Sequence, residues 1–250
     1  MKHEALVLAF VVGTTVGLAA QQAAAPAAPA PRPSAQASAP IDVTGYWVSI
    51  VNEDWRWRMV TPPKGDLASV PLNPEGTKVA NAWDPATDGS CLAYGAGGVM
   101  RMPTRLHITW ENETTLKIET DAGVQTRRFI FDATRKPVGP PSLQGHTVAD
   151  WERPAPARGG GPPPVGGNLK SVTTNLRAAW LRRNGVPYSA GATVTEYVDR
   201  FAAPNKDEWL VVTTIVADAK YLNLDFVTST HFKKEPDGAK WAPTPCKAAL

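Results

Sequence analysis

The chain is 250 residues long, with a formal net charge of +3, 43% hydrophobic residues and 20% charged residues. This length is enough for one domain with a sizeable core and does not require two. The basic surplus is small and includes no block of Lys and Arg, so we predict no nucleic-acid partner.

The N-terminus has the pattern of an export signal. An apolar run from Ala5 to Ala20 has the length of a secretory signal peptide and ends in small residues. It is shorter than the roughly 20 residues that a membrane helix needs. We therefore assign residues 1–20 to a signal peptide, with cleavage between Ala20 and Ala25, and an uncleaved anchor is the alternative. The mature protein is expected to be periplasmic or secreted and to have no membrane span.

Two further segments have compositions that do not support a core. Residues 21–40 are almost wholly Ala, Pro, Gln and Ser, which predicts a flexible tether. Residues 154–167 are so rich in Pro and Gly that we predict a disordered surface loop. That loop interrupts the remaining stretch, 41–250, which is expected to be a single domain.

The chain contains two cysteines, Cys91 and Cys246. In an exported protein such a pair is a candidate disulfide, and two free, buried thiols are the alternative. A bridge between positions about 155 residues apart would stabilise the fold by up to about 5 kcal/mol through chain entropy.

The folded part begins with two short runs, Tyr46–Val51 and Trp55–Val60, that we expect to pair as a β-hairpin. Read at a period of two, the second run puts large apolar side chains on one face and guanidinium groups on the other. The side chains concerned are Trp55 and Trp57 on one face, and Arg56 and Arg58 on the other.

Neighbouring guanidinium groups need a carboxylate partner, a ligand or water. If Arg56 and Arg58 point into a barrel, they could bind an anionic group. If Trp55 and Trp57 point inward instead, the indoles would line an apolar pocket. A purely structural role for all four is the third possibility.

The best helix signal starts at Asn73. This residue can act as the N-cap, Pro74 suits the first helical position, and Glu75 adds a negative charge to the first turn. We expect the helix to continue to Trp83 and to be followed by a loop that contains Cys91.

Turn residues then recur at intervals of about ten, which is typical of an antiparallel meander. The run Trp209–Val216 has no polar face, so we expect both of its sides to be covered. About ten short strands and one helix predict an all-β closed barrel, with a two-sheet sandwich as the alternative. The remaining predicted strands are Arg105–Glu111, Thr115–Asp121, Val124–Asp132, His146–Glu152, Leu169–Leu176, Thr193–Phe201, Glu208–Ala217 and Phe226–Lys233.

Four short motifs, in their order, resemble those of a large family of exported bacterial proteins of unassigned function. They are CLAYG at Cys91–Gly95, GHTVADWE at Gly145–Glu152, NGVPYS at Asn184–Ser189 with TEY at Thr195–Tyr197, and TIVADAKY at Thr214–Tyr221. The resemblance covers most of residues 42–235. It implies a lipocalin-like β-barrel and brings no established activity. Tyr188 and Ala219 stand where the family often has His and Pro, so a His general base at the first position would be absent here.

Histidines on three predicted strands raise the question of a metal site. Together with nearby glutamates they could converge inside a barrel, but no local ligand spacing supports this, and we predict no metal. A second possibility is that His107 pairs with Glu119 across a hairpin and titrates near neutral pH. A third is that these histidines are ordinary surface residues. The residues concerned are His107, His146 and His231, with Glu111, Glu119 or Glu152.

A charge cluster is also possible between Arg127 or Arg128 and two glutamates, Glu119 and Glu196. The register across the turn at residues 122–123 makes Glu119 and Arg127 plausible neighbours. A salt bridge that satisfies a strand pair is the favoured role for this cluster.

Signals for nucleophilic catalysis and nucleotide binding are absent. Residues 145–147 lack the strained elbow of a serine hydrolase, and Ser189 has no evident His partner. Residues 95–98 do not lead from a strand into a periodic helix, so they do not form a phosphate-binding loop. We predict no cofactor.

Three functions remain open. The leading hypothesis is a barrel that binds a small, partly apolar molecule in its interior, and this molecule could carry a negative charge. The sequence does not indicate an oligomeric state. An isomerase, cyclase or lyase that uses His107 or Tyr188 as acid or base is the second. A non-catalytic envelope protein that makes contacts through its tether and its 154–167 loop is the third. The candidate ligand-binding residues are Tyr46, Trp55, Arg56, Trp57, Arg58, Trp110, Glu119 and Arg127.

Overall fold

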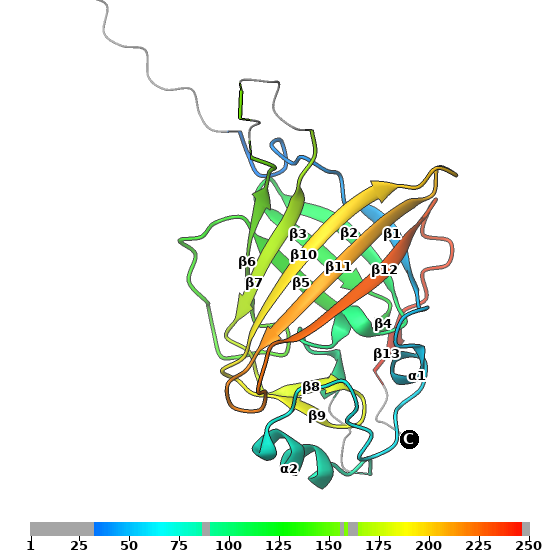
Figure 1. Ribbon diagram of the computed structural model, residues 1–250. Coiled ribbons are helices and arrows are strands. Elements are labelled where there is room, and N and C mark those ends of the chain that lie inside the picture. The colour runs from blue at the N-terminus through cyan, green and yellow to red at the C-terminus, as the bar shows by residue number, and fades with distance from the viewer. Residues whose placement is uncertain (1–32, 87–90, 156–157, 160–164, 247–250) are drawn as a thin grey trace, which may run out of the picture. The chain divides into compact units, whose positions relative to one another are not determined.

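The structure, a computed structural model, describes residues 33–86, 91–155, 158–159 and 165–246. Nine strands close into a barrel in the order β1-β12-β11-β10-β7-β6-β5-β3-β2, and β2 pairs with β1 to complete the ring (Figure 1). Neighbouring strands are antiparallel except β5 and β6, which run parallel. This arrangement confirms the predicted all-β barrel and excludes the sandwich.

The nine barrel strands have the following bounds: β1 Gly45–Ile50, β2 Arg105–Asn112, β3 Thr115–Thr120, β5 Gln125–Ile130, β6 His146–Glu152, β7 Asn168–Thr174, β10 Thr193–Ala202, β11 Glu208–Ala217 and β12 Phe226–Glu235. The eight strands predicted between Arg105 and Lys233 are confirmed, and no end differs by more than two residues.

The smaller elements labelled in Figure 1 gather around one end of the barrel. They comprise two helices, a hairpin of β8 and β9, and a short parallel pairing of β4 with β13. Their bounds are α1 Trp55–Arg58, α2 Pro74–Ala82, β4 Ala122–Gly123, β8 Ala179–Arg182, β9 Val186–Tyr188 and β13 Thr244–Pro245, to which are added two 3-10 turns, η1 Leu92–Tyr94 and η2 Val99–Arg101. Sequence reasoning assigned no element to β8 and β9.

None of the helices in the described part of the chain combines the length and the hydropathy that a membrane span requires.

Helix α2 confirms the predicted helix signal. Asn73 is the N-cap, and its side-chain oxygen accepts a 2.8 Å hydrogen bond from the amide of Gly76. Pro74 and Glu75 occupy the first turn as expected. A capping oxygen of this kind satisfies one of the amides that a helix start leaves without a partner.

The predicted second strand, Trp55–Val60, is wrong. Asp54 adopts a left-handed conformation with φ of 52°, which ends the extended backbone, and α1 follows as a single helical turn. The amides of Trp57 and Met59 donate to the carbonyls of Asp54 and Trp55. Strand β1 needs no hairpin partner at this point because it pairs with β2 and β12. The division into an arginine face and an indole face therefore does not exist.

The expectation that both sides of Trp209–Val216 are covered is also wrong. Leu210 and Val212 are buried inside the barrel, whereas Val211 and Ile215 on the outer face are only half-buried. β-branched side chains suit such a half-exposed, pleated surface as well as they suit a core. A run without charged or strongly polar side chains consequently does not prove that both faces of a strand are buried.

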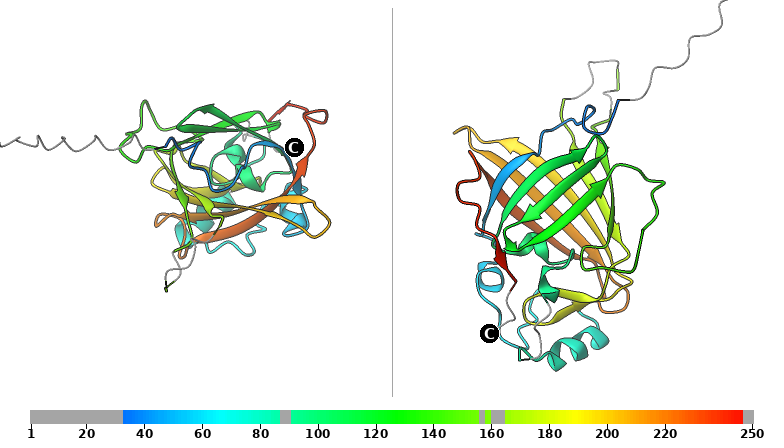
Figure 2. Two further views of the ribbon diagram at one scale, coloured as in Figure 1. Left: turned by 90° about the horizontal axis from the view of Figure 1, so that it is seen from above. Right: turned by 180° about the vertical axis from the view of Figure 1, so that it is seen from behind.

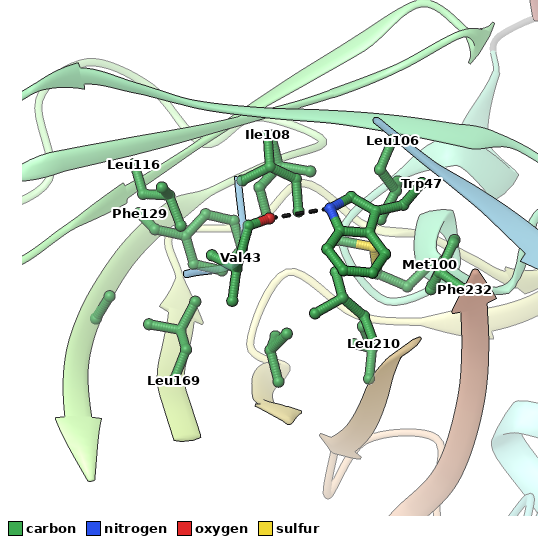
Figure 3. Close-up of a cluster of buried hydrophobic side chains, with 14 of the residues drawn as sticks. Val43, Trp47, Met100, Leu106, Ile108, Leu116, Phe129, Leu169, Leu210 and Phe232 are labelled. Atoms are coloured by element: carbon green, nitrogen blue, oxygen red, sulfur yellow. Dashed lines mark hydrogen bonds between the residues drawn. The ribbon is translucent and has the colours of Figure 1, made fainter. Parts of the chain in front are cut away.

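Apolar side chains fill the interior of the barrel. Alternate residues of each strand face inward, so every strand contributes to one core. Trp47 is fully buried, and its indole N–H donates a 3.0 Å hydrogen bond to the carbonyl of Val43. Figure 3 shows the side chains packed around it, which include Met100, Leu106, Ile108, Leu116, Phe129, Leu169, Leu210 and Phe232. At this level the barrel is a packed core.

Residues 91–103, here called the cap segment, close one end of this core. Val99 and Met100 belong to the interior cluster itself. A second cluster joins the β8–β9 hairpin to inward-facing residues of the barrel, including Leu181, Tyr188, Val194, Val216 and Phe226. The hairpin and the cap segment therefore pack against the barrel as one unit.

Residues 34–44, here called the strap, cross the opposite end (Figure 2). The amide of Gln36 donates to the carbonyl of Glu113 in the β2–β3 turn, and the Trp151 indole on β6 donates to the carbonyl of Ala35. The strap then runs into β1, which lies across the ring from β6.

Several predicted segments extend beyond the described residues. The predicted signal peptide, the tether as far as residue 32 and part of the 154–167 loop all lie outside them. The last part of the predicted tether, residues 33–40, is described and contributes most of the strap.

The predicted disulfide is confirmed. Cys91 and Cys246 are bonded, with their Cα atoms 5.5 Å apart. The bridge joins the start of the cap segment to the segment that follows β13. It closes a long loop, and a cross-link that closes a long loop removes the most conformational freedom from the unfolded chain.

We expect replacement of both cysteines by Ser to lower the free energy of unfolding by about 2–5 kcal/mol. Guanidinium chloride unfolding, with and without a thiol reductant, measures this loss. Reductant should destabilise the wild type to the level of the variant and leave the variant unchanged. A variant as stable as the oxidised wild type would contradict a stabilising bridge.

Candidate functional site

A buried ion pair lies within the barrel. Arg127 on β5 and Glu196 on β10 are 1% and 0% exposed, and the guanidinium meets the carboxylate through two 2.7 Å contacts. Arg127 also donates to Thr173 on β7 at 3.2 Å and stacks over Phe129. Planar, bidentate contacts of this kind are the strongest that an arginine makes with a carboxylate.

The ion pair belongs to a side-chain network that crosses the weakest pairing of the ring. Strands β5 and β6 share only two register pairs, Phe129 with Thr147 and Ile130 with Val148. Inside, the hydroxyls of Thr147 and Thr173 are 2.8 Å apart, and Thr173 accepts from Arg127. The network therefore links β5 to β6, β7 and β10 where backbone hydrogen bonds are few.

The register explains why Arg127 pairs with Glu196 and not with Glu119. Arg127 stands opposite Ile118, whereas Glu119 stands opposite Thr126. Neighbouring residues of a strand point to opposite faces, so Glu119 lies outside the barrel. The expected contact between Glu119 and Arg127 is wrong, and Glu196 is the member of the predicted cluster that Arg127 reaches. Arg128, on the outer face, pairs with Glu111 at 2.8 Å.

The four residues of the α1 turn differ in exposure and in their ionic partners. Arg56 is exposed and pairs with Asp66 at 2.6 Å, and the Trp57 indole donates to the same carboxylate. Arg58 is buried, pairs with Glu53 and donates to the carbonyl of Arg101. Trp55 is 63% exposed. The structure does not bring these side chains together around one interior ligand.

The histidines are equally dispersed. His107 lies 3.4 Å from Glu119, as predicted across the hairpin, and stacks on Tyr46 on the outside of the barrel. His146 contacts the carbonyl of Arg135, and His231 contacts Glu53. Among the described residues no group of three His, Cys, Asp or Glu side chains is placed to hold a metal ion.

Tyr188 lies far from solvent, on β9 in the second core cluster. It is 0% exposed, and an added Cβ would clash with its hydroxyl at Gly95 and with its ring at Gly97. Burial raises its pKa to about 12, against the opposing effects of the Gly97 amide and Arg127. Its hydroxyl is therefore protonated at neutral pH. The structure does not bring Tyr188 near His107, so the two predicted acid–base candidates do not share a site.

The mouth beneath the strap contains an aromatic cluster. Trp110, Phe131 and Trp151 come from β2, the end of β5 and β6, and their rings have centroids 5.1–6.4 Å apart. They follow inward-facing residues at a period of two, so they continue the core up to the rim. Rings at these separations attract one another beyond the effect of area burial.

A pocket of about 370 Å³ lies between this cluster and the strap. Its lining combines indole rings, aliphatic side chains and a few polar groups. The lining residues are Gln36, Ala39, Ile41, Asp42, Val43, Thr44, Trp110 and Trp151. Binding sites for small molecules typically have this size and this mixture of apolar walls with a few polar groups.

Asp42 supplies the charge of this pocket. Burial raises its pKa, but hydrogen bonds from the hydroxyl and amide of Thr44, with the more distant charges of Lys234 and Arg200, lower it further than burial raises it. The carboxyl is consequently ionised at neutral pH and can only accept hydrogen bonds. One of its oxygens, Oδ1, is engaged by Thr44.

Sequence reasoning identified Trp110 but missed Trp151 and the strap. Trp151 lies on the inward face of β6 with Thr147 and Ala149. The period-two alternation along this strand would have predicted that position from the sequence. The strap carried no such signal, because its residues fall partly in a Pro- and Ala-rich stretch that has the composition of a tether.

Comparisons with protein-family models, with curated proteins and with solved structures find no match to this chain. The family resemblance in the sequence motifs therefore stays an expectation, and the barrel itself is the part of it that the structure supports.

We expect Arg127→Met to lower the free energy of unfolding by about 3–5 kcal/mol, because it leaves the Glu196 carboxylate buried without a partner. Urea unfolding measures the loss. The adjacent Arg128→Met is the matched control, and removing its exposed ion pair should cost less than about 1 kcal/mol. The double variant Arg127→Met, Glu196→Leu should recover much of the loss. Equal effects of the two single variants would contradict a special role for the buried pair.

Proposed function

We propose that this chain is an exported β-barrel that binds a small, partly apolar molecule in the pocket beneath the strap. The observation that carries the proposal is the 370 Å³ pocket whose walls include Trp110 and Trp151. Indole rings offer a large, rigid contact surface at a small cost in conformational entropy. The predicted signal peptide and the disulfide support export.

The packed core supports a site at the mouth in preference to one deep in the barrel. Trp47, Leu210 and Phe232 are fully buried, and the Arg127–Glu196 pair satisfies its own charges. A ligand at that level would have to displace these side chains and leave buried charges without partners. At the mouth it needs only to fit between the strap and the aromatic rings.

The polar side of the mouth defines the other end of the ligand. The ionised Asp42 faces the pocket together with Thr44, so a hydroxyl or amine that donates a hydrogen bond would be recognised. Arg200 and Lys234, on neighbouring inward positions, both pair with Glu208, and their charges also act on Asp42. The arginines first considered as anchors, Arg56 and Arg58, do not line this pocket.

N-phenyl-1-naphthylamine, a neutral aromatic amine dye whose N–H can donate to a carboxylate, provides a test on the folded protein. We expect the dye to bind with enhanced fluorescence, and Trp110→Ala and Trp151→Ala each to weaken binding by roughly 5- to 30-fold, a loss of about 1–2 kcal/mol. Trp55→Ala is the matched control, because Trp55 is exposed and lies outside the pocket, and its affinity should equal that of the wild type. Circular dichroism confirms that each variant is folded.

Two outcomes would count against this assignment. The first is unchanged dye affinity in both pocket variants, and the second is an equal loss in Trp55→Ala. Native mass spectrometry of the wild type and of Trp110→Ala, both purified from the producing cell, then identifies any natural ligand by the mass that only the wild type retains.

A further inference from the structure

A cluster of arginines lies at the capped end of the barrel, away from the mouth. Arg58, Arg101, Arg182 and Arg183 all line one small pocket, together with Trp57, Met102 and Leu181. Arg58, Arg101 and Arg182 are 2%, 5% and 3% exposed. Arginines are rarely buried to this extent without a counter-charge.

The described carboxylates do not balance this cluster. Arg58 pairs with Glu53, and Arg101 pairs with Asp54 at 2.9 Å. No carboxylate in the described part of the chain forms an ion pair with Arg182 or Arg183. These two donate to backbone carbonyls, those of Ala68 and Arg58 respectively, at 2.7 and 2.6 Å. Carbonyl groups satisfy hydrogen bonds but do not neutralise charge.

Arg182 is held between two aromatic rings. Its guanidinium carbon lies 4.8 Å from the ring centre of Trp57 and 5.9 Å from that of Phe226. The guanidinium of Arg101 also lies 5.7 Å from the Phe226 ring, so two cations share one aromatic neighbour. Burial, followed by the charge of Arg101, lowers the pKa of Arg182 to about 10. The side chain remains charged at neutral pH in a site that disfavours its charge.

Two guanidinium nitrogen atoms of this pair have no hydrogen-bond partner among the described residues. Nη1 of Arg101 and Nε of Arg182 are buried and make no hydrogen bond to the described residues. A buried donor without an acceptor is costly, and the cost is larger when the donor is charged. Both residues line the same pocket, so a single acceptor there could serve both.

We propose that this pocket binds one chloride-sized monovalent anion between Arg101 and Arg182. The centre of a water-sized sphere can move through only about 10 Å³ of this pocket, so it has room for a single small occupant, and halides are the anions nearest to that size. A carboxylate, sulfate or phosphate is too large for it. A water molecule would accept the hydrogen bonds but would leave the charge of Arg182 unbalanced, whereas a halide does both.

Thermal unfolding of the wild type in chloride, bromide and gluconate, at equal sodium concentration, tests this site. Gluconate is too large for the pocket and controls for ionic strength. The halides should raise the unfolding temperature in a saturable way, by roughly 3–6 °C at about ten times the dissociation constant. The increment should disappear in Arg182→Gln and in Arg101→Gln. The matched control Arg128→Gln removes an exposed arginine and should keep it.

Crystals grown in bromide give a readout that does not depend on any variant. An anomalous peak between Nη1 of Arg101 and Nε of Arg182 is the expected result. If anomalous peaks appear at surface positions alone, bromide is an adventitious ion only and the proposal is overturned. A water molecule between the two arginines would overturn it as well. Equal unfolding temperatures of the wild type in chloride and gluconate would also overturn it, whether or not the arginine variants fold.

Discussion

The bidentate contact between Arg127 and Glu196 links β5 to β10 across the barrel interior, beside the seam where backbone pairing is weakest. Strands β5 and β6 share two register pairs, whereas β10 and β11 share ten. The ion pair extends from β5 to β10, and its threonine neighbours connect it to β6 and β7. Hydrogen bonds in this low-dielectric interior are stronger than at the surface, although Nε of Arg127 is buried and makes no hydrogen bond to the described residues. Closure at this seam thus depends on side chains more than on the backbone.

The same contact limits where a ligand can bind. A buried pair with apolar neighbours cannot be opened without exposing charges to an environment that does not solvate them. The packed core around Trp47 includes Phe129, over which Arg127 lies, and the cap segment contributes Val99 and Met100 to that core (Figure 3). A cavity of useful size is consequently left at the rim, where the strap completes the walls that the strands begin.

The two ends of the barrel use aromatic rings differently. At the mouth, Trp110 and Trp151 face a pocket together with the carboxylate of Asp42. At the capped end, Trp57 and Phe226 stack on the guanidinium of Arg182. An aromatic face attracts cations, so the second arrangement stabilises part of the arginine charge without any carboxylate. The fold therefore places an aromatic pocket with one carboxylate at one end and a group of arginines at the other.

Much of the fold was readable from the sequence, because strand alternation and turn residues are local signals. Asn73 and Pro74 likewise marked the start of α2. The error at Trp55–Val60 has a physical cause: six residues of alternating pattern also fit one helical turn, and the left-handed Asp54 together with the partners of β1 decided between them. The pairing of β1 with β2 and β12 involves residues that are distant in the sequence, so a local pattern does not reveal it.

The site was less readable than the fold. The sequence placed Arg127 and Glu196 in one charge cluster. It did not show that Glu119 and Arg127 point to opposite faces of the sheet, because this depends on a strand register that is offset by one residue. The pocket depends on the strap, whose composition resembles that of a flexible tether. Nothing in residues 34–44 alone indicates that they cross a barrel mouth, because their partners, Glu113 and Trp151, are distant in the sequence.

Fluorine NMR on protein labelled with 5-fluorotryptophan tests binding at the mouth most directly. Trp47 reports on the packed interior, Trp110 and Trp151 on the mouth, and each resonance is assigned by a Trp→Phe variant. Addition of N-phenyl-1-naphthylamine should shift the resonances of Trp110 and Trp151 and leave that of Trp47 in place. A shift of Trp47 with the two mouth resonances unchanged would contradict a filled barrel with its binding site beneath the strap.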